Sequence, residues 1–147
     1  MSGGVLLHIG LAWAGDVAFL VAGLSGLIYL YQERQLKAKN AAFLRRAGLS
    51  LEALDRVNLW ALWIGFVLFT VGVLHGMWLA RGRLGWTDPK TVFALATWGV
   101  YTVLLAVRTT ALSRGPKVAA ISALGILLVG FTFIGVNTLL HSQHHFF

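Results

Sequence analysis

Three of the five histidines lie near the end of the sequence, in the segment NTLLHSQHHFF that follows an apolar run. Asn137, His141 and His144 are spaced i, i+4 and i+7, so a helix that continues this far places them on one face, and His145 points elsewhere. Imidazole nitrogens bind zinc, copper and haem iron. The chain has no cysteine, which excludes thiolate metal sites and disulfides. The segment is therefore either a set of metal ligands or a solvated histidine tract.

Two other ionisable side chains lie inside apolar runs. His75, in GVLHGMW, is either a functional group or a neutral histidine that hydrogen-bonds a neighbouring helix, with the glycines allowing close packing. Asp16 follows His8 by eight residues, which is about 12 Å along a helix and on a similar face. A carboxyl group at that depth is protonated or paired. We expect either a proton or quinone role for Asp16 or a hydrogen bond across a helix bundle.

Long apolar segments position these residues. Of the 147 residues, 58% are hydrophobic and 12% are charged, a balance typical of helices in lipid. A helix needs about 20 apolar residues to cross a bilayer. The sequence therefore predicts one all-α membrane domain over residues 1–147, a polytopic antiparallel bundle of four transmembrane helices, at 6–31, 57–80, 89–107 and 118–140.

Basic residues predict the orientation of this bundle. They concentrate in a predicted cytoplasmic basic loop, 32–56, and in the segment 108–117, because positively charged loops stay on the cytoplasmic side. Both termini and all five histidines then lie on the outer, periplasmic side of an inner (cytoplasmic) membrane. The net charge of +7 comes mainly from these topology signals, so we expect no nucleic acid as a partner.

The third apolar segment and its approach, GRLGWTDPKTVFALATWGVYTVLLAVR, resemble a known motif. The run is similar to the tryptophan-rich haem-handling segment of the cytochrome c assembly family, the membrane proteins of CcsA, CcmC and HemX type. The matching residues are Trp86, Asp88, Pro89, Lys90, Trp98, Tyr101 and Arg108. The segments YLYQERQLK, LEALDRVN and GFTFIGVNTLL also resemble the family, and together they correspond to the C-terminal half of a typical member.

The resemblance implies a haem site on the outer face. Family members hold haem there between two histidines, whose matching positions are His8 and His144, with His141 a near neighbour of the second. The expected haem is haem b, held without a covalent bond because no CxxCH is present. Trp86 and Trp98 are the expected aromatic walls, Asp88 belongs to the motif, and Arg81 and Arg83 are expected near the propionates. His75 is an additional candidate ligand.

Two functions follow from this resemblance. The first is a haem-binding membrane protein that presents haem for cytochrome c maturation. The alternative is a b-haem electron-transfer or accessory subunit of a membrane redox complex, with quinone a possible partner. The sequence contains no recognisable catalytic carboxylate pair or nucleophile, which leaves enzyme activity undecided and favours a subunit over a stand-alone enzyme. We expect other membrane subunits, and cytochrome c or its assembly factors, as partners.

Overall fold

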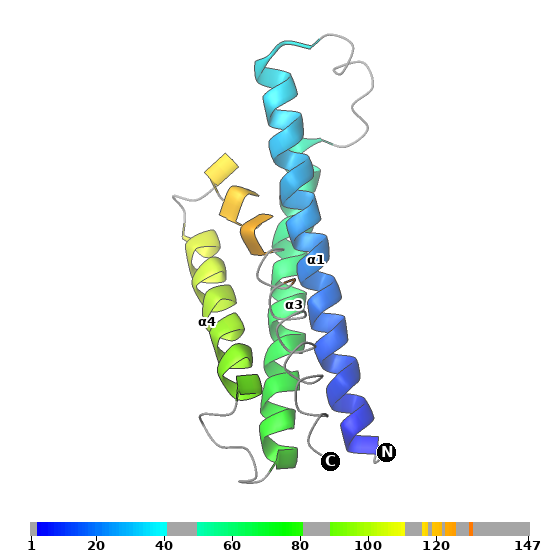
Figure 1. The fold of residues 1–147 in the computed structure, drawn as a ribbon. Helices are drawn as coiled ribbons and strands as arrows, with labels where there is room; N and C mark the ends of the chain where they lie inside the picture. The colour runs from blue at the N-terminus through cyan, green and yellow to red at the C-terminus, as the bar shows by residue number, and fades with distance from the viewer. Residues whose placement is uncertain are drawn as a thin grey trace, which may run out of the picture.

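The computed structural model describes residues 3–40, 50–80, 89–110, 116–117, 119–121, 123–125 and 130. The structure contains three long helices, α1 (Gly3–Lys37), α3 (Leu51–Ala80) and α4 (Pro89–Thr109). Each of them runs antiparallel to the one before it in the chain (Figure 1). Further helical residues follow at 116–117, 119–121 and 123–125. The described residues form helices and no strand, which confirms the all-α prediction. Most of the expected fourth span, 118–140, lies outside the described residues.

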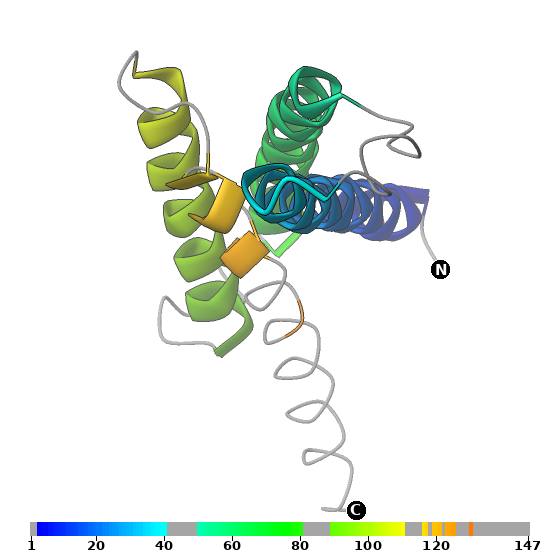
Figure 2. The same ribbon diagram turned by 90° about the horizontal axis from the view of Figure 1, so that it is seen from above.

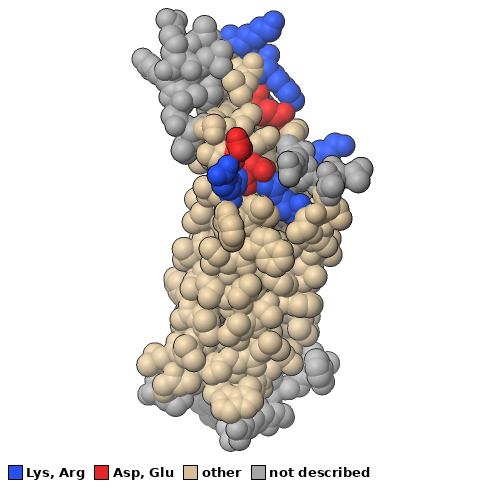
Figure 3. Space-filling model, turned by 180° about the vertical axis from the view of Figure 1, so that it is seen from behind, with Lys and Arg blue, Asp and Glu red and all other residues tan. Residues whose placement is uncertain are grey.

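All three helices are long and apolar enough to cross a membrane. Their spans cover 35, 29 and 19 residues, with mean hydropathies of 1.9, 2.1 and 1.5. Large apolar side chains are exposed along α1 and α3, as a helix in lipid requires. On the face shown in Figure 3, the charged side chains of the described residues gather at one end, next to a long body of uncharged residues. The chain is a multi-pass membrane protein.

The helices continue into the segment expected to form a loop, 32–56. α1 runs to Lys37 and α3 begins at Leu51. Each extension carries an ion pair between residues one helical turn apart. Lys37 pairs with Glu33, and Arg56 pairs with Glu52, both at 2.8 Å. Ser50 caps α3, since its Oγ accepts the backbone N–H of Ala53 at 3.1 Å. Polar helix turns therefore extend beyond the apolar spans.

α1 and α3 pack closely because small residues lie between them, and their axes cross at an angle (Figure 2). Gly15 is so close to α3 that a Cβ there would lie 3.2 Å from the backbone nitrogen of Phe69. A Cβ on Gly65 would lie 2.7 Å from the ring of Phe19. Asn58 adds a buried hydrogen bond from its Nδ2 to the carbonyl of Ala22, at 2.7 Å.

α4 joins this pair through aromatic and polar contacts. The ring of Tyr101 stacks on Phe19 with a centroid distance of 3.4 Å, and both side chains are almost fully buried. The Tyr101 hydroxyl donates to the carbonyl of Gly125 at 3.2 Å. At the charged end, Arg108 of α4 pairs with Asp55 of α3 at 2.7 Å. The core thus spans all three helices.

Candidate functional site

His8 of α1 projects into the interface with α3. Its Nδ1 lies 2.9 Å from the carbonyl oxygen of Gly72. A carbonyl oxygen accepts and cannot donate, so Nδ1 carries the proton in this contact. The neutral imidazole then keeps its lone pair on Nε2, the atom that remains available to a metal.

Gly76 provides the space that the His8 ring occupies. A Cβ at residue 76 would lie 2.6 Å from Cε1 of His8 and 3.0 Å from its Nδ1. Any side chain there would displace the ring and strain the bond to Gly72. Gly72 and Gly76, one turn apart on α3, therefore form the surface that the His8 imidazole contacts, which we call the glycine seat.

His75 lies beside this seat. Its ring centroid is 6.4 Å from that of His8 and 6.0 Å from the ring of Trp78. The Nδ1 atom of His75 is buried and has no hydrogen-bond partner among the described residues. Leaving a buried polar atom unsatisfied costs about 1–3 kcal/mol, so this nitrogen lacks the compensation that buried polar atoms usually have.

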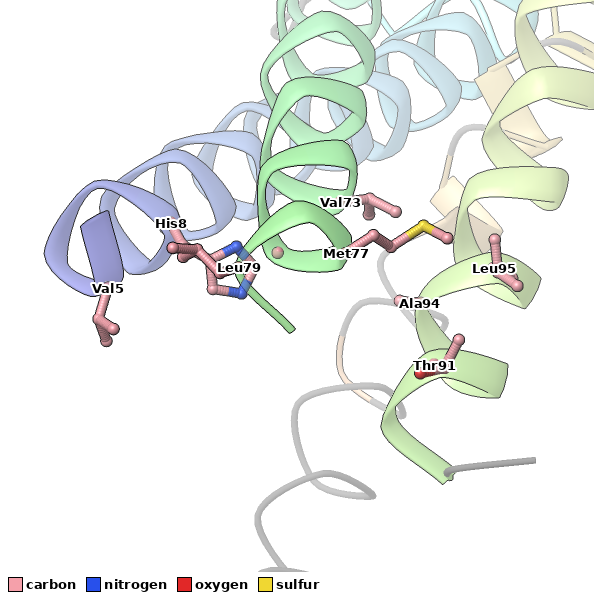
Figure 4. Close-up of a pocket in the computed structure, with 9 residues that line it drawn as sticks. Val5, His8, Val73, Met77, Leu79, Thr91, Ala94 and Leu95 are labelled. Carbon is pink, nitrogen blue, oxygen red and sulfur yellow. The ribbon is translucent and has the colours of Figure 1, made fainter. Parts of the chain in front are cut away.

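An apolar cavity opens next to His8 at the end of the bundle opposite the charged side chains. Its volume is about 320 Å³, and it lies where the first turns of α1 and α4 meet the last turns of α3. Figure 4 shows His8 projecting from α1 toward α3, with Val73 and Met77 of α3 facing Thr91 and Leu95 of α4. The volume is near the lower end for small-molecule sites. His8 is the ionisable residue that lines it among those described.

Trp98 lies deeper in the bundle than this cavity and does not line it. Its Nε1 donates to Thr70 Oγ1 at 3.0 Å, and its ring stacks on Phe66 at 5.9 Å. Thr70 Oγ1 in turn donates to the carbonyl of Phe66 at 2.7 Å. Trp98 thus ties α4 to α3 beneath the cavity.

Asp16 is half-buried in the apolar part of α1. It interacts electrostatically with Tyr101 of α4 and has no hydrogen bond within the described part of the chain. It lies about two turns deeper along α1 than His8, and the two residues do not share the cavity.

The structure brings together His8 and His75 from the expected site residues. Trp98 and Asp16 lie elsewhere in the bundle. The remaining expected site residues lie outside the described part of the chain: Arg81, Arg83, Trp86, Asp88, His141 and His144.

The glycine seat was not among the residues predicted from the sequence. Gly72 and Gly76 flank His75 in the sequence, and their G-x-x-x-G spacing is the signal that could have indicated close approach of another helix. That signal does not say which residue of which helix approaches. The register of α1 against α3 decides that His8 occupies the seat.

Membrane-crossing helices with a histidine-lined cavity at one end define a multi-pass membrane protein with a candidate ligand site. The model of the cytochrome c assembly protein family matches residues 1–144. The chain belongs to this family. No solved structure matches it.

Curated relatives agree with this assignment. The chain is 28% identical to the cytochrome c biogenesis protein CcsA of Synechococcus sp. (strain CC9902), over 97% of this chain and 56% of that protein. It is 35% identical to the CcsA protein of Gloeobacter violaceus, over 70% of this chain and 31% of the relative. The CcsA protein of Chlamydomonas reinhardtii is 36% identical over 63% of the chain. The chain spans about half the length of the curated relatives it matches.

Proposed function

We propose that this protein handles haem in cytochrome c biogenesis, holding haem b at the outer end of the bundle with His8 as one axial ligand. The observation that carries the proposal is the bond from His8 Nδ1 to the Gly72 carbonyl. Ligating histidines commonly donate their other ring N–H to a carbonyl, which fixes the tautomer and the ring orientation.

The cavity beside His8 fits a flat apolar group. Gly76 and Ala94 contribute no bulk, and Met77 and Leu95 give apolar contacts. Bound haem would supply an iron centre that binds neutral imidazole nitrogen. His8 would hold the iron through Nε2, while the apolar lining would exclude water from that bond. Haem would remain partly outside a cavity of this volume, which suits a protein that passes haem on.

The second axial ligand is proposed from the family resemblance. His144 matches the family position after the last helix, and His141 is its competitor one turn earlier. Trp86 and Asp88 belong to the matching motif, and Arg81 and Arg83 would pair with the propionates. These residues complete the proposed site.

His75 supports a second candidate function, a permanent b-haem site in an electron-transfer or accessory subunit. Its buried Nδ1 has no hydrogen-bond partner among the residues that the structure describes, and its ring lies 6.4 Å from that of His8, so a second imidazole lies beside the first. Asp16 would then take up or release a proton, or contact a quinone. Reversible reduction of the haem in a stable complex with other redox subunits would favour this candidate over haem delivery.

The proposed orientation places the histidines outside. The basic segment 32–56 lies at the cytoplasmic side of an inner membrane, both termini lie at the periplasmic side, and the fourth span covers 118–140. Cytochrome c or its assembly factors would meet the outer end, where the cavity opens. Other membrane subunits are further proposed partners.

A haem-transfer assay separates the two candidates. Protein purified in detergent with haem bound is mixed with an apocytochrome, and the haem absorption of both partners is followed after they are separated. Movement of haem to the apocytochrome supports biogenesis. Retention of all haem, together with a reversible reduction potential, supports the electron-transfer candidate.

A further inference from the structure

A second cavity, of about 400 Å³, lies at the charged end of the bundle, remote from His8. It is formed where α3 begins and α4 ends, at the limits of two membrane spans. Its charged lining residues are Glu52, Asp55, Arg56 and Arg108. Figure 3 shows acidic and basic side chains meeting where the apolar body of the molecule begins.

The charges of this cavity balance. Among the residues that the structure describes, two carboxylates and two guanidinium groups line it, and their formal charges sum to zero even though the chain carries +7. A purely anionic ligand would be repelled by Glu52 and Asp55, and a purely cationic ligand by Arg56 and Arg108. A ligand with one positive and one negative group would match both pairs.

The cavity also has a polarity gradient. Along α3 the lining changes from Glu52 and Arg56 to Leu59 and then Trp63, which is 42% exposed. Arg56 and Trp63 are about 10 Å apart along the helix axis. A charged rim above an apolar and aromatic wall fits an amphiphile, because tryptophan favours the membrane–water interface.

The two ion pairs differ in how firmly they are held. The Arg108 side chain is 3% exposed and bonds both the Asp55 carboxylate, at 2.7 Å, and the Asp55 carbonyl, at 3.0 Å, while its Nε has no partner among described residues. Glu52 and Arg56 are 82% and 67% exposed. The inner pair is therefore fixed in place, and the exposed outer pair can separate and bind other partners.

We propose that this cavity binds the headgroup of a phosphatidylethanolamine lipid. Arg56 holds the phosphate, and Glu52 and Asp55 accept N–H bonds from the ammonium group. The glycerol and upper acyl chains lie against Leu59 and Trp63. Phosphatidylcholine has no N–H to donate, and phosphatidylglycerol has no positive charge, so each lacks one half of the match.

Native mass spectrometry of the full-length protein tests this. The protein is equilibrated with equal amounts of phosphatidylethanolamine, phosphatidylcholine and phosphatidylglycerol of identical acyl chains, and bound lipid is counted. We expect about tenfold more phosphatidylethanolamine than either other lipid, the ratio that one charge-assisted hydrogen bond provides. Equal binding, or preference for phosphatidylglycerol through the positive net charge, would overturn the proposal.

A matched pair of variants locates the site. The double substitution E52Q/R56Q removes the outer pair without changing net charge, and both side chains are exposed, so the fold persists. E33Q/K37Q removes an ion pair of the same i, i+4 spacing on α1, outside the cavity, in which Lys37 is 71% and Glu33 16% exposed. The first variant should lose the phosphatidylethanolamine preference and the second should keep it. If both keep it, or both lose it, the cavity is not the site. Free phosphoethanolamine at the same concentration should not displace the lipid, because it lacks the contacts to Leu59 and Trp63.

Discussion

His8 of α1 donates a hydrogen bond from Nδ1 to the carbonyl oxygen of Gly72 on α3, across 2.9 Å. The bond links the two most extensively packed helices at the end that carries the cavity. It also determines which ring nitrogen is free. The chemistry proposed for this protein therefore depends on the packing of two helices as much as on the histidine itself.

Replacing Gly76 by alanine should disrupt the site while leaving the fold intact. The new Cβ would lie 2.6 Å from Cε1 of His8, so the ring must move and its bond to Gly72 must break. We expect haem affinity to fall by about tenfold or more, the equivalent of one hydrogen bond and its orientation. Haem titration followed by absorption measures this.

Gly10→Ala on α1 is the matched control, because a Cβ there meets no atom within 4 Å. It should bind haem as the unmodified protein does. Equal haem affinity in the Gly76→Ala and Gly10→Ala variants would show that the seat does not hold His8 in a functional position.

Replacing Asp55 should destabilise the protein more than replacing its ion-pair partner Arg108. Asp55→Ala leaves the guanidinium of Arg108, 3% exposed, without its carboxylate, and should lower the free energy of unfolding by about 3–5 kcal/mol. Arg108→Met leaves Asp55, which is 34% exposed and can be hydrated, and should cost about 1 kcal/mol or less. Unfolding in mixed detergent micelles compares the two. A larger loss for Arg108→Met would contradict the explanation by desolvation.

Of the four spans predicted from hydropathy, three correspond to long helices among the described residues, because long apolar runs in lipid leave few alternatives. The sequence also placed His8 and His75 near the same end. It could not predict that the two rings lie 6.4 Å apart or that Gly76 faces His8, because these depend on the register between helices distant in sequence. Trp98 illustrates the same limit: its role as a haem wall stays a prediction, and the sequence did not indicate that its N–H donates to Thr70.

Trp98 should therefore affect stability more than haem binding. Trp98→Phe keeps the stacking on Phe66 and removes the hydrogen bond to Thr70 Oγ1, which should cost about 1 kcal/mol. Thr70→Val should cost a similar amount, and the double variant less than the sum, because both remove the same bond. If the double variant lost as much stability as the two single variants together, the hydrogen bond would contribute nothing to the free energy of unfolding. A haem spectrum altered by Trp98→Phe at unchanged stability would make Trp98 part of the haem site.

The proposed topology can be tested directly, since the chain contains no cysteine. Single substitutions Ser2→Cys and Lys39→Cys place one thiol near the N-terminus and one after the end of α1. In intact cells a membrane-impermeant thiol reagent should label the first and spare the second. Labelling of Lys39→Cys alone would reverse the orientation and place the His8 cavity on the cytoplasmic side.

Haem binding by the purified protein is the most direct test of the central claim. The protein is expressed with ample haem, purified in detergent, and its absorption spectrum and pyridine-haem content are measured beside those of the variant His8→Ala/His144→Ala. We predict a haem b Soret band in the unmodified protein and its loss in the double variant, with His145→Ala unchanged. A protein without a Soret band, or a double variant that retains the full band, would contradict the account.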